Sequence, residues 1–100
     1  MSWATRYIAM LRAGQTVQFR PRGRSMAGRI ESGNLVTVEP LNGRAPQVGD
    51  IVLCSVRGAQ YLHLVKAVSA RGFLIGNNRG GTNGWTSAAH IYGRCTRVEN

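Results

Sequence analysis

Short apolar segments with the composition of β-strands follow one another along most of this chain. Gly, Pro or Asn separates each from the next. The segments cover residues 16–19, 35–39, 50–56, 61–70, 73–76 and 91–98. Strands this short, in a chain with 13 glycines, require tight turns and curled sheets. We therefore predict a mainly β fold, a single strongly bent antiparallel β domain.

A short helix is expected before the first of these strands. Ser2 can cap a helix that begins at Trp3 and ends at about Ala13, with Gly14 directly after it. One apolar stripe runs along this helix, and it consists of Trp3, Tyr7, Met10 and Leu11. This stripe would pack the helix against the β core.

The length of the chain limits the number of domains. A chain of 100 residues with 43% hydrophobic residues can bury one core but not two. We expect one domain over residues 1–100, with the helix at about 2–13 and the β core at about 15–98. Residues 57–60 are typical of a hairpin turn. Residues 77–84 are too rich in Gly and Asn for a regular element, which predicts an irregular surface loop.

Neither a membrane segment nor a redox site is indicated. The apolar segments are far shorter than the roughly 20 residues that cross a bilayer, and the N-terminal residues lack the pattern of a secretory signal. We therefore expect a soluble, cytoplasmic protein. Cys54 and Cys95 each lie in an apolar segment without a second ligand nearby, and we interpret both as core thiols. The sequence predicts no cofactor and no metal centre, and it leaves the oligomeric state open.

The chain is strongly basic, with 13 basic residues, 4 acidic ones and a formal net charge of +9. Such a surface attracts polyanions. The basic residues are nevertheless scattered, and aromatic residues do not alternate with them as in a base-stacking surface. Only one group is close together: Arg20, Arg22, Arg24 and Arg29. We expect a solvated basic surface with at most weak, non-specific and salt-sensitive contact with nucleic acid.

Lysine occurs once, at Lys66, since 12 of the 13 basic residues are arginines. A side-chain period of two places Lys66 on one strand face with Leu62, Leu64 and Val68. Apolar surroundings lower the pKa of a lysine amine, whereas an arginine stays protonated. Lys66 is therefore a candidate general base. The alternative is a lysine on an edge strand whose amine reaches water.

Neither of the 2 histidines is expected to take part in chemistry. His63 lies in the same segment as Lys66, but the period of two places it on the opposite face, with Tyr61 and Val65. We expect His63 and His90 to be surface residues or hydrogen-bonded structural ones.

A serine stands between the first two predicted strands. Gly23 lies two residues before Ser25, and the residues after Ser25 can form one helical turn. Where the chain bends in this way, the backbone N–H groups of Arg24 and Ser25 can converge near the hydroxyl and form an oxyanion hole. A Gly-x-Ser loop is also a common ordinary turn. Ser25 is thus a candidate nucleophile that needs a partner.

Five blocks, in this order, resemble the LexA and signal-peptidase superfamily of serine peptidases. They are GRSM at 23–26, ESGNLVTV at 31–38, VGDIVL at 48–53, LVKAV at 64–68 and IYGR at 91–94. In that family a serine precedes Met, a Gly-Asp turn opens a strand, and a lysine after the next hairpin is the general base. The resemblance covers about residues 17–98 and implies the bent β domain of that family.

The resemblance implies a Ser-Lys dyad. Ser25 would be the nucleophile, Lys66 in its neutral form would take the proton from the hydroxyl, and the amides of Arg24 and Ser25 would hold the oxyanion. Gly23 would keep the turn open, and Met26 would line the substrate groove or else belong to the core. The expected function is a small serine peptidase that hydrolyses a peptide or protein substrate in trans through an acyl-enzyme.

Two other classes of protein stay open. A catalytically inactive member of the same fold would bind a peptide or protein without needing Ser25 near Lys66. A basic β-barrel that binds nucleic acid would need its arginines on one face. The dyad itself requires the Lys66 amine at about 2.6–3.2 Å from the Ser25 hydroxyl, or somewhat farther without substrate.

Overall fold

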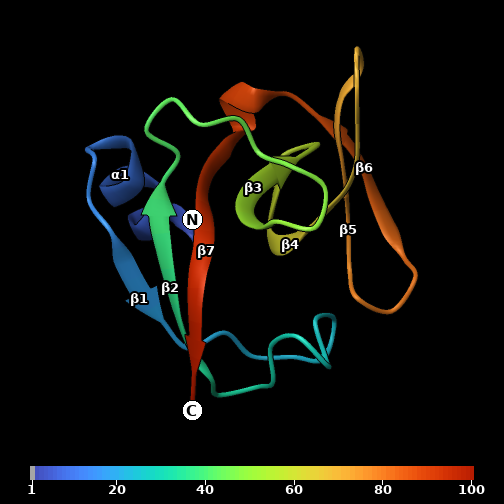
Figure 1. Cartoon of the computed structure of the whole chain (residues 1–100). Coiled ribbons are helices and arrows are strands. Elements are labelled where there is room, and N and C mark those ends of the chain that lie inside the picture. The colour runs from blue at the N-terminus through green and yellow to red at the C-terminus, as the bar shows by residue number, and fades with distance from the viewer. Residues whose placement is uncertain (1) are drawn as a thin grey trace.

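The computed structural model describes residues 2–100, which form a mainly β protein with one α-helix (Figure 1). Helix α1 (Thr5–Arg12) comes first, and a short 3-10 helix, η1 (Ala88–His90), precedes the last strand. The strands are, in chain order, β1 (Val17–Phe19), β2 (Leu35–Pro40), β3 (Ile51–Val56), β4 (Ala59–Ser69), β5 (Gly72–Gly76), β6 (Thr82–Thr86) and β7 (Ile91–Glu99). The prediction of a mainly β fold is confirmed.

All strands belong to one antiparallel sheet in the order β1-β2-β7-β3-β4-β5-β6. Register shifts interrupt the pairings β2–β7, β3–β7, β4–β5 and β5–β6. Such bulges bend a strand and increase its twist. In Figure 1, β1, β2 and β7 stand on one side of β3 and β4, and the β5–β6 pair stands on the other. The antiparallel arrangement expected from the sequence is therefore present, and its irregularities lie at bulges.

Strand β3 is buried on both faces, because the sheet folds around it. Ile51 and Leu53 point into one core with Leu62 of β4, while Val52 and Cys54 point into a second core on the other face. All residues of β3 are buried. This accounts for its sequence, which is apolar except for Ser55, since alternation of apolar and polar residues appears only where one face meets water.

Helix α1 is shorter than predicted. It begins at Thr5 after Ala4 rather than at Trp3, and the Ser2 hydroxyl accepts the Ala4 N–H at 3.2 Å, so Ser2 caps the turn that leads into the helix. Leu11 is buried as expected, whereas Trp3 remains 51% exposed. No helix among residues 2–100 is long and apolar enough to cross a membrane.

Strand β6 was not expected, because part of it falls in the Gly- and Asn-rich segment predicted to be a loop. It pairs with β5, and Trp85 lies opposite Leu74. Only the residues between Gly76 and Thr82 form the connecting loop. The hairpin predicted at residues 57–60 is confirmed as a two-residue turn at Arg57 and Gly58, both with positive φ, as a type I′ turn requires.

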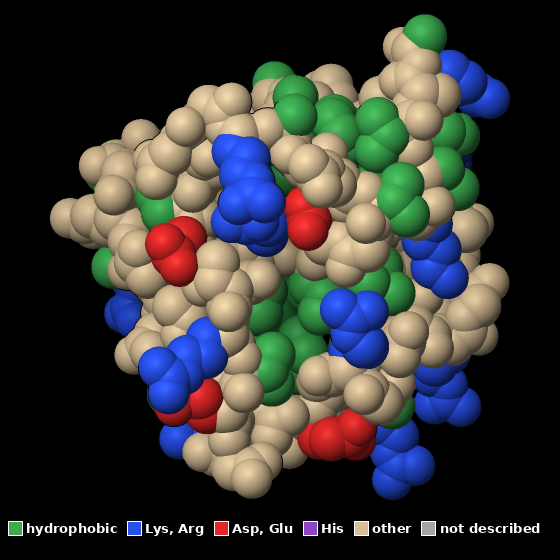
Figure 2. All heavy atoms as spheres, viewed as in Figure 1, with side chains coloured by type: hydrophobic (Ala, Val, Ile, Leu, Met, Phe, Trp, Pro, Cys, Tyr) green, Lys and Arg blue, Asp and Glu red, His purple; other side chains and the backbone are tan. Residues whose placement is uncertain are grey.

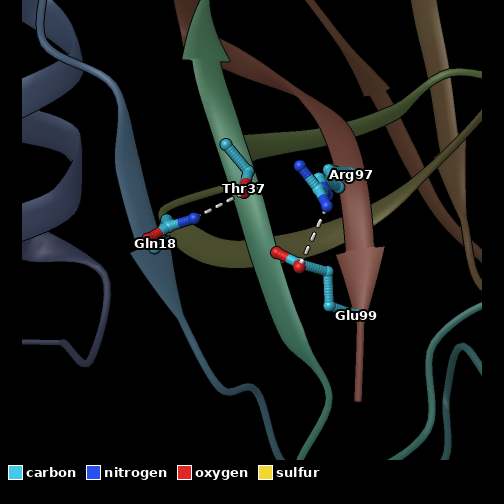
Figure 3. Close-up of polar contacts among 4 residues, drawn as sticks. All are labelled: Gln18, Thr37, Arg97 and Glu99. Atoms are coloured by element: carbon cyan, nitrogen blue, oxygen red, sulfur yellow. Dashed lines mark hydrogen bonds and ion pairs between the residues drawn. The ribbon is translucent and has the colours of Figure 1, made fainter.

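Exposed polar contacts on β1, β2 and β7 contribute little to the stability of the sheet. Gln18 of β1 donates to the Thr37 hydroxyl of β2 at 3.0 Å, and Arg97 forms an ion pair with Glu99 within β7 at 3.3 Å (Figure 3). Exposed ion pairs of this kind contribute about 0–1 kcal/mol. Arginines on the face shown in Figure 2 lie in separate groups and not in one patch.

Candidate active site

Ser25 lies in a turn that connects β1 to β2. The turn closes through hydrogen bonds from the Ala27 N–H to the Arg24 carbonyl at 3.0 Å and from the Ile30 N–H to the Met26 carbonyl at 2.7 Å. Met26 and Ile30 are buried in the core and anchor the turn from below. Ser25 itself belongs to the exposed part of the turn, as a nucleophile must.

Gly23 allows the chain to enter this turn. Its φ of 110° lies in a region that side-chain-bearing residues rarely adopt. No atom lies within 4 Å of the position that a Cβ would occupy at Gly23, so the backbone conformation rather than space requires glycine here. The expectation that Gly23 keeps the turn open fits this geometry.

The Ser25 hydroxyl is hydrogen-bonded to a histidine. Ser25 Oγ lies 3.0 Å from His63 Nε2. His63 belongs to β4, opposite Val52 of β3, and its ring stacks on Tyr61 with the ring centroids 5.0 Å apart. Only 7% of His63 is exposed. The imidazole is therefore held in one orientation by its strand, by an aromatic neighbour and by the serine.

An asparagine holds the other nitrogen of this imidazole. His63 Nδ1 lies 2.7 Å from Asn83 Oδ1 on β6. Because the amide oxygen can only accept, His63 carries its proton on Nδ1, and Nε2 is free to accept the proton of the Ser25 hydroxyl. The three residues form a continuous chain of hydrogen bonds with the polarity that general-base activation of a serine needs.

The loop between β5 and β6 forms hydrogen bonds to the turn that carries Ser25, which we call the serine turn. The Asn78 N–H donates to the Ser25 carbonyl, and the Asn78 side-chain amide donates to the Ala27 carbonyl, both at 2.8 Å. Asn77 shapes the loop from inside, since its Oδ1 accepts the N–H groups of Arg79 and Gly81. The hairpin that carries Asn83 therefore also fixes the backbone of Ser25.

Lys66 lies at an irregularity in the pairing of β4 with β5. It is the extra residue of a β-bulge, since Val65 pairs with Ile75 and Ala67 with Leu74. The stem of its side chain packs beside Gly76, where an added Cβ would come within 3.0 Å of both Lys66 Cδ and Cε. Within residues 2–100, the Ser25 hydroxyl has no hydrogen bond to Lys66, and its side-chain partner is His63. The expected Ser-Lys contact is thus replaced by a Ser-His contact.

The surroundings of His63 favour its neutral form. Burial lowers the pKa of His63 below its ordinary value of 6.5, the positive charge of Lys66 lowers it further, and the hydrogen bond to Asn83 acts in the opposite direction. A neutral imidazole is the form that can accept a proton. The lysine singled out from the sequence therefore influences the site through its charge.

Backbone N–H groups near the serine are free to donate. In the part of the chain that the structure describes, the N–H groups of Arg24 and Ser25 donate to no protein acceptor, whereas the N–H groups of Ala27 and Ile30 close the turn. Free amides at the start of such a turn are suited to an oxyanion. Both groups are therefore available as donors in the turn that carries Ser25.

A groove of about 530 Å³ opens beside Ser25 and His63. It runs between the N-terminal helix, the segment from β1 to the serine turn, and the start of β4. Gly23 and Met26 both line it, and Met26 also belongs to the core with only 5% exposure. The two roles considered for Met26 from the sequence are therefore compatible.

The remaining candidate side chains lie away from this groove. His90 is exposed, with its Nδ1 3.1 Å from the Ser87 hydroxyl. Cys54 is fully buried, and burial raises its pKa to about 12, which fits the predicted core thiol. Cys95 is only half-buried, so for this residue the prediction of a core thiol holds in part.

The sequence did not point to Asn83, and His63 was expected to be a surface residue or a hydrogen-bonded structural one. Asn83 lies in a segment whose Gly and Asn content masked a strand, and nothing in its local sequence points to His63. One sequence feature could have identified His63 as a site residue: it is a polar residue among apolar ones on the strand that follows the predicted hairpin. A comparison with protein-family models finds no match for this chain, and a comparison with curated proteins finds none either.

Proposed function

We propose that this chain is a serine peptidase with Ser25 as nucleophile and Asn83 as the residue that orients the imidazole, in which His63 takes the place of the lysine base of the family that the sequence resembles. The observation that carries the proposal is the pair of contacts from His63, at 3.0 Å to Ser25 Oγ and at 2.7 Å to Asn83 Oδ1. These distances lie in the range that proton transfer requires. The free amides of Arg24 and Ser25 complete the set of groups.

The reaction follows from this arrangement. Ser25 Oγ attacks the carbonyl carbon of the substrate while its proton passes to His63 Nε2, and the resulting oxyanion accepts hydrogen bonds from the two backbone amides. The intermediate collapses, the C–N bond breaks, and the leaving amine takes the proton from His63. Water then attacks the acyl ester with His63 as base, which releases the acid and restores Ser25.

Lys66 has a different role in this proposal from the one expected. Its charge near His63 disfavours a second positive charge on the imidazole, which keeps the base neutral. Its aliphatic stem fills the space above Gly76. Loss of the amine should therefore change the pH at which His63 becomes active rather than remove the base.

The test is labelling of the purified protein with a fluorophosphonate, which phosphonylates activated serines and releases fluoride. Ser25→Ala should abolish labelling, and His63→Gln should slow it by a factor on the order of 10² to 10⁴, the usual contribution of a general base. Lys66→Met should label within a few-fold of the wild-type rate. Ser32→Ala and His90→Gln are the matched controls, because both residues are exposed and lie outside the groove.

Two results would contradict the proposal. Labelling of His63→Gln at the wild-type rate together with loss of labelling in Lys66→Met would return the base to Lys66. Labelling that is absent in the wild type, in a protein shown by NMR to be folded, would indicate a catalytically inactive binding protein.

A further inference from the structure

One wall of the groove beside Ser25 is aromatic. These aromatic residues take no part in the reaction proposed for the Ser25 hydroxyl. Tyr7 of α1 stacks on Phe19 of β1 with the ring centroids 4.5 Å apart, and the Trp3 ring lies 5.7 Å from Phe19. All three line the groove. Phe19 is buried but Trp3 is 51% exposed, so the indole offers an uncovered apolar surface beside the site.

Charge is distributed unevenly around the same groove. Arg20, Arg22 and Glu31 line it, and Arg24 follows beside Ser25. The Glu31 carboxylate already accepts the Gly28 N–H at 2.7 Å, and Arg20 donates to the Gly33 carbonyl at 2.7 Å. Arg22 makes no side-chain hydrogen bond or ion pair within residues 2–100 and is exposed. The groove therefore presents positive charge next to an apolar wall.

From these features we infer that the substrate of this site is an extended acidic peptide segment that carries an aromatic or large aliphatic side chain, seated against Trp3 with a carboxylate near Arg22. The inference rests on the proposed function, because it assigns the groove to the substrate of Ser25. A volume of about 530 Å³ suits one or two side chains with their backbone.

A single-stranded nucleic acid fits the groove less well. Base stacking needs open aromatic faces. Phe19 is covered by Tyr7, which leaves Trp3 as the open face of this wall, whereas successive bases stack on more than one open ring. The combination of one open aromatic ring, mixed charge and an adjacent serine favours a peptide.

The experiment uses the full chain with Ser25→Ala, so that binding is measured without turnover. Four probes are titrated: a blocked pentapeptide with a central Phe flanked by glutamates, the same peptide with lysines in place of the glutamates, the glutamate peptide with Gly in place of Phe, and a single-stranded oligonucleotide. In NMR the Trp3 indole N–H signal reports binding, and the backbone N–H signals of Gln60 and Leu62, which also line the groove, report it in Trp3→Ala as well. The Trp85 indole signal is the internal reference, because Trp85 does not line the groove.

The glutamate–Phe peptide should bind about tenfold more tightly than either changed peptide, and Trp3→Ala and Arg22→Glu should each weaken it about fivefold, as expected for a half-exposed apolar contact and an exposed charge. Arg44→Glu, an exposed arginine outside the groove, is the control with the same change of net charge and should stay within twofold.

Equal binding of the lysine peptide, equal loss in Arg44→Glu, or tighter binding of the oligonucleotide at the Trp3 signal would overturn the inference. Other outcomes distinguish failure of the proposed peptidase function from failure of this inference about the groove. Selective peptide binding by a wild-type protein that neither labels nor cleaves would support the assignment of the groove and contradict the peptidase. Labelling of Ser25 without discrimination among the peptides would support the peptidase and contradict the assignment of the groove.

Discussion

At the scale of single residues, the feature that distinguishes the site is that an amide, and not a carboxylate, contacts Nδ1 of His63. Asn83 fixes the imidazole and its tautomer through a 2.7 Å contact with Nδ1, but it brings no negative charge to stabilise an imidazolium. The nearby charge of Lys66 acts against protonation as well. The environment therefore favours the starting, neutral state of the base over the protonated state that forms during the reaction.

The pH dependence of labelling tests this balance. In the proposed mechanism neutral His63 is the active form. Since burial lowers its pKa below 6.5, the labelling rate should rise from acid pH with a midpoint below 6.5 and then stay level. Asn83→Asp should raise that midpoint by about one unit or more, since a carboxylate in contact favours the imidazolium. Labelling rates from pH 4 to 9, with NMR titration of His63, measure both values.

The His90 signals should not change in Asn83→Asp, which controls for a general effect of the added charge. A wild-type midpoint in the alkaline range would indicate an amine as base. An unchanged midpoint in Asn83→Asp would mean that Asn83 does not contact His63 in solution.

At the scale of elements, the β5–β6 hairpin joins parts of the site that are distant in the sequence. Its loop binds the backbone of the serine turn through Asn78, and its second strand carries Asn83 to His63. The loop also has internal hydrogen bonds to Asn77, so its conformation does not depend on the turn alone. Placement of both the nucleophile and the base thus depends on one hairpin.

Asn78→Ala should therefore reduce labelling more than it reduces stability. The substitution removes the side-chain hydrogen bond to the Ala27 carbonyl, and we expect labelling to fall about tenfold while the free energy of unfolding falls by about 1 kcal/mol. Arg79→Ala is the matched control, because it changes an exposed side chain in the same loop. Labelling and urea unfolding are measured on each protein. Equal labelling rates of the two variants would show that the loop does not position Ser25.

At the scale of the whole molecule, the site lies above a core that several elements share. Leu53 on β3 is fully buried in the core that also holds Phe19 and Met26, the residues beneath the groove. The opposite face of β3 belongs to the second core. Loss of packing at β3 should therefore affect the whole sheet rather than one strand.

Leu53→Ala should lower the free energy of unfolding by about 2–5 kcal/mol, because it removes buried methyl groups and leaves a cavity. Val48→Ala, at a position that is 62% exposed, should change it by about 0.5 kcal/mol or less. Urea unfolding followed by circular dichroism measures both. A loss in Leu53→Ala no larger than in Val48→Ala would contradict the described core.

Local patterns in the sequence predicted most of the fold. The strands near β2, β3, β4 and β7 follow from apolar segments bounded by turn residues, and the hairpin at Arg57 and Gly58 follows from a glycine between two such segments. Strand β6 was missed because its pairing with β5 overrides the weak strand preference of Asn83 and Gly84. Such pairing energy comes from a neighbour and not from the segment itself.

The candidate nucleophile could also be chosen from the sequence, since Gly23, Ser25 and Met26 form a local turn with its own geometry. The base could not. A period of two places His63 and Lys66 on opposite faces but does not say which face the serine turn approaches, and the bulge at Lys66 ends the strict alternation. Only the folded sheet, which brings β4, β6 and the serine turn together, decides that Ser25 meets His63 and that Asn83 orients it. These contacts join residues far apart in the chain, so their geometry depends on the packing of the whole sheet.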